Sequence, residues 1–142
     1  MAYALGLVHN VFIVRWIQPA AGDAKKILKA LRAARDSCSG PIVYLAVLPE
    51  DCTAPEESTR KEISDGIPVV LEYCSSIHMV LEGSSMKRAT MRAIAAGMFL
   101  LTGKRGRVMT HETVLEALRR AEKLRVSPEL IIAAAKAQKL LT

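Results

Sequence analysis

Two short polar stretches hold the residues best suited to chemistry, and each follows an apolar run typical of a buried β-strand. Glu50-Asp51-Cys52-Thr53 follows Ile42–Leu48, and Glu82-Gly83-Ser84-Ser85 follows Ile77–Leu81. In a parallel sheet the carboxyl ends of the strands meet at one edge, and the N-termini of helices present unpaired N–H groups there. If the two strands are neighbours, a thiol and several hydroxyl groups therefore converge where an anion could bind.

Lys87 and Arg88 would bring two cations to this edge. The same loops could instead contact a protein partner or be modified, through the side chains of Asp51, Cys52, Thr53, Ser58, Ser84 and Ser85. A structural alternative is that the hydroxyl groups only cap helices and that the cations are solvated. Gly83-Ser84-Ser85 favours this alternative, because it lacks the glycine density and the lysine spacing of a phosphate-binding loop.

Cysteine and histidine form no metal-binding or catalytic pattern. The three cysteines, Cys38, Cys52 and Cys74, are an odd number without C-x-x-C spacing, so we expect reduced thiols and neither a disulfide framework nor a zinc site. The histidines at positions 9, 78 and 111 are far apart in the sequence and form no metal-ligand pair. We therefore predict no catalytic residue, no metal and no cofactor, and the sequence gives little support to an enzyme.

The composition is that of one globular domain without a transmembrane segment. The chain has 142 residues, of which 51% are hydrophobic, and a mean hydropathy of +0.20, so it can bury a core without disulfides or metals. No apolar run reaches the roughly 18 to 20 residues that span a bilayer, and Met1–Leu5 lacks the basic region of a secretory signal. We therefore expect a cytoplasmic protein.

The formal net charge of +6 is unevenly distributed along the chain. Acidic residues cluster between Glu50 and Asp65, whereas basic residues gather later and could form a patch. The residues of this basic patch would be Lys87, Arg88, Lys104, Arg105 and Arg107. Only 4% of the residues are aromatic, so base stacking is poorly supported and a nucleic-acid partner is not expected. An ordinary solvated surface is the alternative for these cations.

Hydrophobic periodicity predicts strands that alternate with helices. The chain opens with a β-hairpin that turns at His9-Asn10, and the odd and even residues of its second strand are expected on opposite faces. In order, the predicted elements are strands 3–8 and 11–17, a helix from Asp23 to the stop at Ser39-Gly40-Pro41, strand 42–48, a helix, strand 77–81, helix 86–102, strand 107–109, a helix capped at Thr113, and a last helix 130–140.

The helix after Ile42–Leu48 has a strong start pattern but contains helix breakers. Thr53-Ala54-Pro55-Glu56 combines a capping box with a proline in the first turn, so we predict Thr53 as the cap. Gly66 and Pro68 follow, and a proline inside a helix removes one hydrogen bond and clashes with the preceding turn. We therefore expect a kink or break near Ser64–Pro68.

The helix Met86–Thr102 has an unusually wide apolar face. Met91, Ile94, Met98 and Leu101 lie on one stripe, and small residues such as Ala93 and Gly97 lie beside it. Such a face exceeds what one sheet contact requires. Either the helix is almost fully buried in the core, or it is shared with a second subunit or another partner.

These elements predict an α/β fold with a mixed sheet of about five strands, formed by the N-terminal hairpin and βαβ units, covered by helices and followed by two C-terminal helices. This order and length resemble the STAS domain, in particular the SpoIIAA-like anti-sigma-factor antagonists and the STAS/SEC14-like bacterial group. The resemblance depends on this order and length more than on a motif, and three phrases are similar to the bacterial group: Ile13-Val14-Arg15-Trp16, Ile42-Val43-Tyr44-Leu45 and Thr102-Gly103-Lys104-Arg105-Gly106-Arg107. It implies a STAS-like domain over residues 1–125 and a C-terminal helix, residues 126–142, packed on it.

The resemblance implies a non-catalytic regulatory or adaptor module that binds a protein partner, in some cases as a homodimer, through the helix after the central strand. In the antagonists of this family a phosphorylatable serine lies in an Asp-Ser-Ser-Gly-type turn. Here only Asp51 and Thr53 match its acid-then-hydroxyl character, and the glycine is absent. The SEC14-like part of the resemblance implies an alternative, a protein that binds a small ligand or lipid between the sheet and the helices.

Overall fold

The structure is a computed structural model that describes residues 3–83, 86–102 and 107–142, and it describes the side chains of these residues except at 86–88 and 98–102. Five strands of the described residues form one mixed sheet, in which β1 and β2 are antiparallel and all other neighbours are parallel. The predicted α/β class and mixed sheet are confirmed. In sheet order the strands are β1 (Tyr3–Val8), β2 (Val11–Trp16), β3 (Ile42–Leu48), β4 (Cys74–Leu81) and β5 (Val108–His111).

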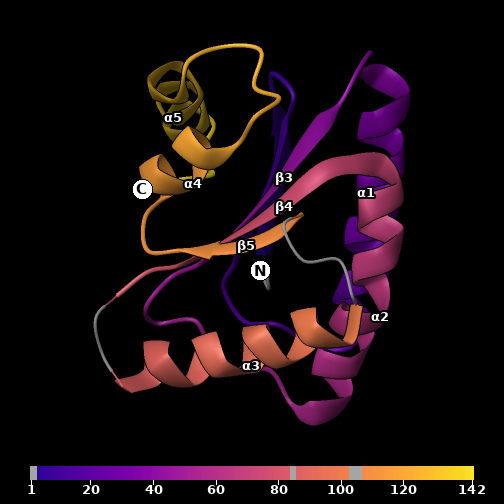
Figure 1. The fold of residues 1–142 in the computed structure, drawn as a ribbon, viewed down its shortest axis with the longest axis vertical. Coiled ribbons are helices and arrows are strands. Elements are labelled where there is room, and N and C mark those ends of the chain that lie inside the picture. The colour runs from indigo at the N-terminus through magenta and orange to yellow at the C-terminus, as the bar shows by residue number, and fades with distance from the viewer. Residues whose placement is uncertain (1–2, 84–85, 103–106) are drawn as a thin grey trace.

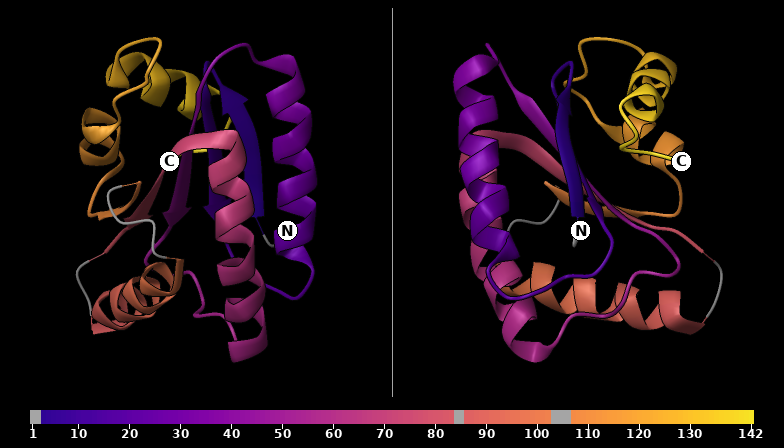
Figure 2. Two further views of the ribbon diagram at one scale, coloured as in Figure 1. Left: turned by 45° about the vertical axis from the view of Figure 1, so that its right-hand side comes forward. Right: turned by 180° about the vertical axis from the view of Figure 1, so that it is seen from behind.

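The described residues also form five helices, which pack around this sheet (Figure 1). They are α1 (Asp23–Ser37), α2 (Glu57–Tyr73), α3 (Met86–Thr102), α4 (Val114–Arg120) and α5 (Pro128–Ala137). The views in Figure 2 place α1 and α2 on one side of the sheet and α4 and α5 on the other. Figure 1 also shows that α3 runs across the end of the sheet, at a large angle to α1 and α2. No helix among the described residues is long and apolar enough to cross a membrane.

The sheet separates two hydrophobic clusters, and β3 contributes to both because all seven of its residues are buried. In β2, Phe12 and Val14 belong to the cluster under α1 to α3, while Val11 and Ile13 belong to the cluster under α4 and α5. This is the alternation that the strand pattern predicts. The identity of Ile42–Leu48 as the central, doubly buried strand is confirmed.

The start of α2 differs from the prediction. The helix begins at Glu57, Glu56 occupies the N-cap position without a side-chain cap, and Thr53 lies exposed in the preceding loop. Thr53 as the helix cap was therefore wrong. Pro55 explains the later start, because proline restricts the residue before it to extended backbone and so disfavours a helix that includes Ala54.

We predicted a kink or a break within α2. The break was wrong, because the helix continues through Gly66 and Pro68 as far as Tyr73, and the kink stays a prediction. Pro68 removes one backbone hydrogen bond, but Ile67, Val70 and Leu71 on either side of it are buried against the sheet. Tertiary packing of this kind outweighs local propensity. The chain then passes directly into β4, which begins at Cys74, three residues before the predicted strand.

The helix caps of the C-terminal region match their sequence patterns. The side chain of Thr113 accepts a hydrogen bond from the backbone N–H of Glu116 at 3.1 Å, and Ser127 accepts one from Leu130 at 3.4 Å. The last helix starts and ends earlier than the predicted 130–140. It buries Ile131 and Ala135 in the second hydrophobic cluster, so this segment helps to cover the sheet.

Asn10 joins its hairpin turn to two distant loops. It is completely buried, and its side-chain amide donates to the carbonyl oxygens of Pro41 at 3.1 Å and Lys123 at 2.6 Å. Its carbonyl oxygen accepts from the backbone N–H of Arg125 at 3.1 Å. One side chain thus satisfies backbone groups of the α1–β3 and α4–α5 connections, where a buried unpaired group would be costly.

Arg107, just before β5, joins the end of α2 to the sheet. Its Nη2 donates to the carbonyl oxygens of Leu71 at 2.8 Å and Cys74 at 2.9 Å, and its Nε donates to that of Ser75 at 3.3 Å. The positive charge therefore lies at the C-terminus of a helix, where the macrodipole favours a cation. This residue of the predicted basic patch is engaged within the fold.

We expect Arg107→Met to lower the free energy of unfolding by about 2–4 kcal/mol, because the substitution leaves several partly buried carbonyl groups without a donor. Arg92→Met is the matched control. Arg92 is 46% exposed in its side chain and has only a 3.5 Å ion pair with Glu112, so its loss should change stability by less than about 1 kcal/mol. Urea unfolding followed by circular dichroism measures both values. Equal effects of the two substitutions would contradict the structural role of Arg107.

Candidate functional site

The two loops at the carboxyl ends of β3 and β4 meet, as the sequence predicts for neighbouring parallel strands. Gly83 has a φ of 98°, and a Cβ atom at this position would lie 2.6 Å from Cγ of Glu50. The space beside Cys52 measures only about 10 Å³, which is at most enough for a single water molecule. The described part of this edge therefore leaves no room for an anion. Ser84 and Ser85 lie outside the described residues.

The other predicted loop residues are spread over different environments. Asp51 and Thr53 are exposed in the loop before α2, and Ser58 is exposed in the first turn of that helix. Cys52 is 2% exposed, and its Sγ lies 3.7 Å from the carbonyl oxygen of Thr53. All three cysteines are buried, and burial raises the pKa of the Cys74 thiol to about 12, with Arg35 and Arg107 acting in the opposite direction.

The predicted interface helix, α3, is partly covered by the chain itself. Met91 is buried and Ile94 is half-buried, and both line a cavity of about 40 Å³ beneath the helix. The small residues beside them remain exposed, namely Ala89, Ala93, Ala96 and Gly97. The predicted wide apolar face is thus divided between a buried stripe and an exposed stripe of small side chains. The side chains of Met98 and Leu101 lie outside the described residues.

Most of the predicted basic patch also lies outside the described residues. This applies to the side chains of Lys87 and Arg88 and to Lys104 and Arg105, while Arg107 binds the backbone as described above. The structure therefore brings none of these cations together in the part of the chain that it describes.

A groove between α2 and α3 brings together two of the predicted residues, Ser58 and Ile94. Its volume is about 1000 Å³. One wall is the outer face of α2 and the other is the exposed stripe of α3. The residues that line it are Glu56, Glu57, Ser58, Arg60, Lys61, Ser64, Asp65, Ala93, Ile94 and Gly97. The charged residues of α2 were missed as site residues, because nothing in the sequence shows which helix they face.

Two buried histidines on the opposite side of the sheet were also missed. His78 in β4 and His111 in β5 are 2% and 3% exposed. Nδ1 of His78 and Nε2 of His111 are 2.9 Å apart, and the two rings stack with their centroids 5.1 Å apart. They meet because Val80 pairs with His111 in the parallel register, which places His78 diagonally opposite on the same face of the sheet.

A polar group lies at each end of this histidine pair. Nε2 of His78 is 2.9 Å from the hydroxyl of Ser76, and Nδ1 of His111 is 3.9 Å from a carboxylate oxygen of Glu116 in α4. The carboxylate favours a proton on Nδ1 of His111. The Nε2 of His111 then accepts from Nδ1–H of His78, and the Nε2 of His78 accepts from the Ser76 hydroxyl.

Burial keeps both histidines neutral near pH 7. Desolvation is the largest cause that lowers the pKa of His78, to about 4, and the neighbouring His111 lowers it further. Desolvation also lowers the pKa of His111, while Glu116 acts in the opposite direction. Uncharged rings satisfy each other's hydrogen bonds in the core, as buried polar groups must.

The order carboxylate, histidine, histidine, hydroxyl has the connectivity of an activated serine, but both histidine rings are almost completely buried, whereas such chemistry needs an exposed nucleophile. None of the five cavities described in this structure is lined by Ser76, His78 or His111. Among the described residues, no group of three histidine, cysteine or acidic side chains could hold a metal ion. The pair therefore acts as a buried polar link between β4, β5 and α4.

This pair should make the protein less stable in mild acid. A histidine in the unfolded chain has a pKa of about 6.5, so the unfolded state binds more protons than the folded state as the pH falls below that value. The free energy of unfolding should therefore decrease from pH 7 to pH 5. Urea unfolding across this range measures the decrease, and the double variant His78→Leu with His111→Leu should show less of it.

His9→Asn is the control for this measurement, because His9 lies exposed in the hairpin turn with a φ of 53°, a conformation that asparagine tolerates. This variant should retain the decrease of the wild-type protein, since the buried pair is intact. A wild-type stability that is constant between pH 7 and pH 5 would contradict the neutral, buried state of the pair.

Comparison of the chain with protein-family models, with curated proteins and with solved structures found no match. The resemblance to the STAS domain thus stays a prediction that depends on three short phrases and on the order of the elements. The candidate sites that the geometry defines are the groove between α2 and α3, the histidine pair, and the cavities on the α1 to α3 side of the sheet.

Proposed function

We propose that this chain is a non-catalytic regulatory or adaptor module that binds a protein partner in the groove between α2 and α3. The observation that carries the proposal is the groove itself, because at about 1000 Å³ it is far larger than the other cavities described. It is also the place where Ser58 and Ile94, predicted as partner-binding residues from different elements, lie together.

The chemistry of the groove fits a helical segment of a partner. Ala93 and Gly97 give a floor of small side chains onto which another helix can pack closely, and the half-buried Ile94 adds apolar surface. An apolar floor with a polar rim is the usual composition of a protein interface. An amphipathic helix lying in a groove is a recurrent mode of peptide recognition.

The wall formed by α2 carries charges of both signs. Glu57 and Asp65 are exposed acids, and Lys61 is an exposed base between them. A partner helix with small or apolar residues on one side and complementary charges along its edges matches this wall. Charges at the rim set orientation and association rate more than affinity.

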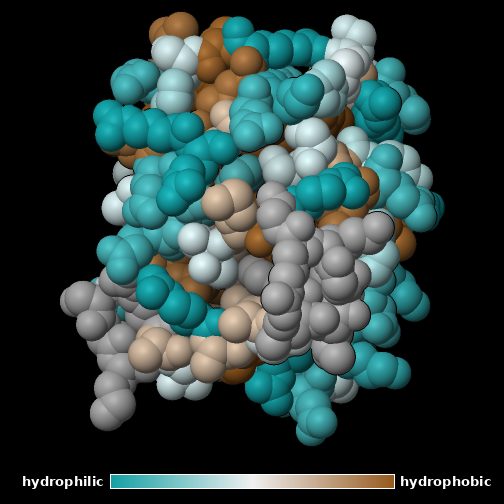
Figure 3. All heavy atoms as spheres, viewed as in Figure 1, coloured by the Kyte–Doolittle hydropathy of each residue, from teal (hydrophilic) through white to brown (hydrophobic). Residues whose placement is uncertain are grey.

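In Figure 3 pale brown residues of weak hydrophobicity lie at the lower edge, over α3, next to strongly hydrophilic ones.

The STAS resemblance supports the same surface. It implies docking through the helix that follows the central strand, and that helix is α2, which comes directly after β3. A second copy of this chain is one form that the partner could take, since the same groove would then be used twice about a two-fold axis.

Lipid binding, the alternative that the SEC14-like resemblance implies, has less support. The cavities between the sheet and helices α1 to α3 measure about 60 and 40 Å³, whereas sites for drug-sized ligands measure about 300–1000 Å³. An acyl chain does not fit either cavity among the described residues.

The proposed docking surface can be tested by photo-crosslinking. A photoreactive amino acid at Ser58 should capture a protein in cells that contain the natural partner, and Ala93→Glu in the same chain should prevent the capture. Ala33→Glu is the matched control, because Ala33 is exposed on α1 and does not line the groove. Circular dichroism confirms that both variants are folded.

The captured protein, identified by mass spectrometry and purified, is then titrated against each variant. We expect Ala93→Glu to weaken binding by about tenfold or more, since it places a charge in the apolar floor, and Ala33→Glu to leave the affinity unchanged. Analytical ultracentrifugation separates self-association from binding to another protein. A partner that binds both variants equally well would overturn the proposed surface.

A further inference from the structure

Tyr44, in the middle of β3, has a hydroxyl group that no described residue satisfies. The side chain is 8% exposed, and its ring packs against Phe12 with the centroids 5.7 Å apart. No hydrogen bond joins the hydroxyl to any described residue. Every polar side-chain atom of the described residues that is completely inaccessible to solvent has a hydrogen-bond partner. Since the Tyr44 hydroxyl has none, it must retain some accessible surface, which we assign to the cavity that Tyr44 lines. A buried tyrosine hydroxyl usually finds a partner.

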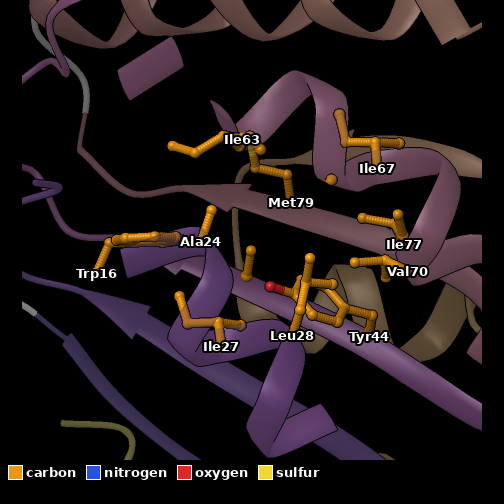
Figure 4. Close-up of a pocket in the computed structure, with 12 residues that line it drawn as sticks. Trp16, Ala24, Ile27, Leu28, Tyr44, Ile63, Ile67, Val70, Ile77 and Met79 are labelled. Atoms are coloured by element: carbon orange, nitrogen blue, oxygen red, sulfur yellow. The ribbon is translucent and has the colours of Figure 1, made fainter. Parts of the chain in front are cut away.

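This cavity lies between the sheet and helices α1 and α2 and has a volume of about 60 Å³. Figure 4 shows the oxygen of Tyr44 pointing into the space that the labelled side chains surround. Ile27 and Leu28 from α1, Val70 from α2 and Ile77 from β4 form much of the wall. Apart from Tyr44 and Trp16, the side chains that line the cavity carry no oxygen or nitrogen atom.

Water is a poor occupant for such a site. A buried water molecule is held by two to four polar partners, and apolar cavities stay dry. Here one hydroxyl group faces a wall of branched aliphatic side chains. A molecule with an apolar body and one hydrogen-bonding group would form a hydrogen bond with the hydroxyl and would pack against the aliphatic wall.

The dimensions limit the ligand to a small molecule. A second cavity of about 40 Å³ shares Trp16, Ile63 and Met79 with the first. Met79 is flexible and only partly buried, and methionine adapts readily to irregular spaces, so its movement would join the two cavities. The joined space approaches the size of an apolar cavity of about 150 Å³ that holds benzene.

Helix α2 offers a route into the cavity. Gly66 lines it, and Pro68 lacks the N–H that would bond to the carbonyl group of Ser64. Glycine and proline both weaken a helix interior. The part of α2 that lies over the cavity therefore has weakened helical hydrogen bonding, and a local opening there would admit a ligand.

We propose that this cavity is a binding site for a compact apolar molecule of single-ring size that carries one hydrogen-bonding group, and that the Tyr44 hydroxyl recognises that group. The site is separate from the groove between α2 and α3, so the result of a test on one does not decide the other.

Phenol and toluene are suitable probes, because they share a ring and differ in the group that would meet Tyr44. Each is titrated into the protein, and the amide shifts are followed by NMR. We expect phenol to bind more tightly than toluene and to shift signals of Leu28, Ile67 and Val70. Tyr44→Phe should weaken phenol binding by about 3- to 10-fold, the loss that one hydrogen bond implies, and should leave toluene binding nearly unchanged.

Two further variants make the test specific. Tyr73→Phe removes a hydroxyl from a tyrosine that does not line the cavity, and should leave phenol binding unchanged. Ala24→Leu fills the cavity from α1 and should abolish the binding of both probes. Phenol binding that is absent in the wild-type protein, equal in Tyr44→Phe, or mapped to residues away from the cavity would overturn the proposal.

Discussion

The structure depends on the burial of β3 on both of its faces. A strand whose seven residues are all buried needs cover above and below the sheet. The three parallel connections run in one direction, from β2 to β3, then to β4 and β5. Because such crossovers share one handedness, their helices α1, α2 and α3 must lie on the same face. The opposite face can then be covered only by what remains of the chain.

This constraint explains the role of the C-terminal helices. Ile131, Ala135 and Leu140 belong to the cluster that covers the second face of β3. Without residues 126–142, the inner side chains of this face would be exposed to water. The central strand would then lose the hydrophobic stabilisation that comes from this face of the sheet. The segment is therefore part of the same hydrophobic unit as the sheet. Asn10 strengthens this connection, because it binds the backbone of the α4–α5 loop.

Much of the fold could be predicted because its signals are local. Alternation in β2, the uninterrupted apolar run of β3 and the capping box at Thr113 each depend on a few neighbouring residues, and each is confirmed. The start of α2 and its passage through Pro68 depend on packing against the sheet, so local patterns gave the wrong result there. The histidine pair could be predicted only from the register of β4 against β5. The groove could be predicted only from the angle between α2 and α3, which no short sequence pattern contains.

Helix α2 connects the two sites proposed for this chain. Ile67 and Val70 on its inner face line the cavity below Tyr44, while Glu57 and Lys61 on its outer face line the groove beside α3. The helix also contains its own weak point at Gly66 and Pro68, and its C-terminus is fixed to the sheet by Arg107. Its N-terminal half is held as well, because the backbone N–H of Gly22 donates to the carboxylate of Glu62 at 3.0 Å. Since the residues of the groove lie in that N-terminal half, a displacement of α2 away from the cavity would also change the shape of the groove, whereas a movement of Met79 would leave the groove as it is.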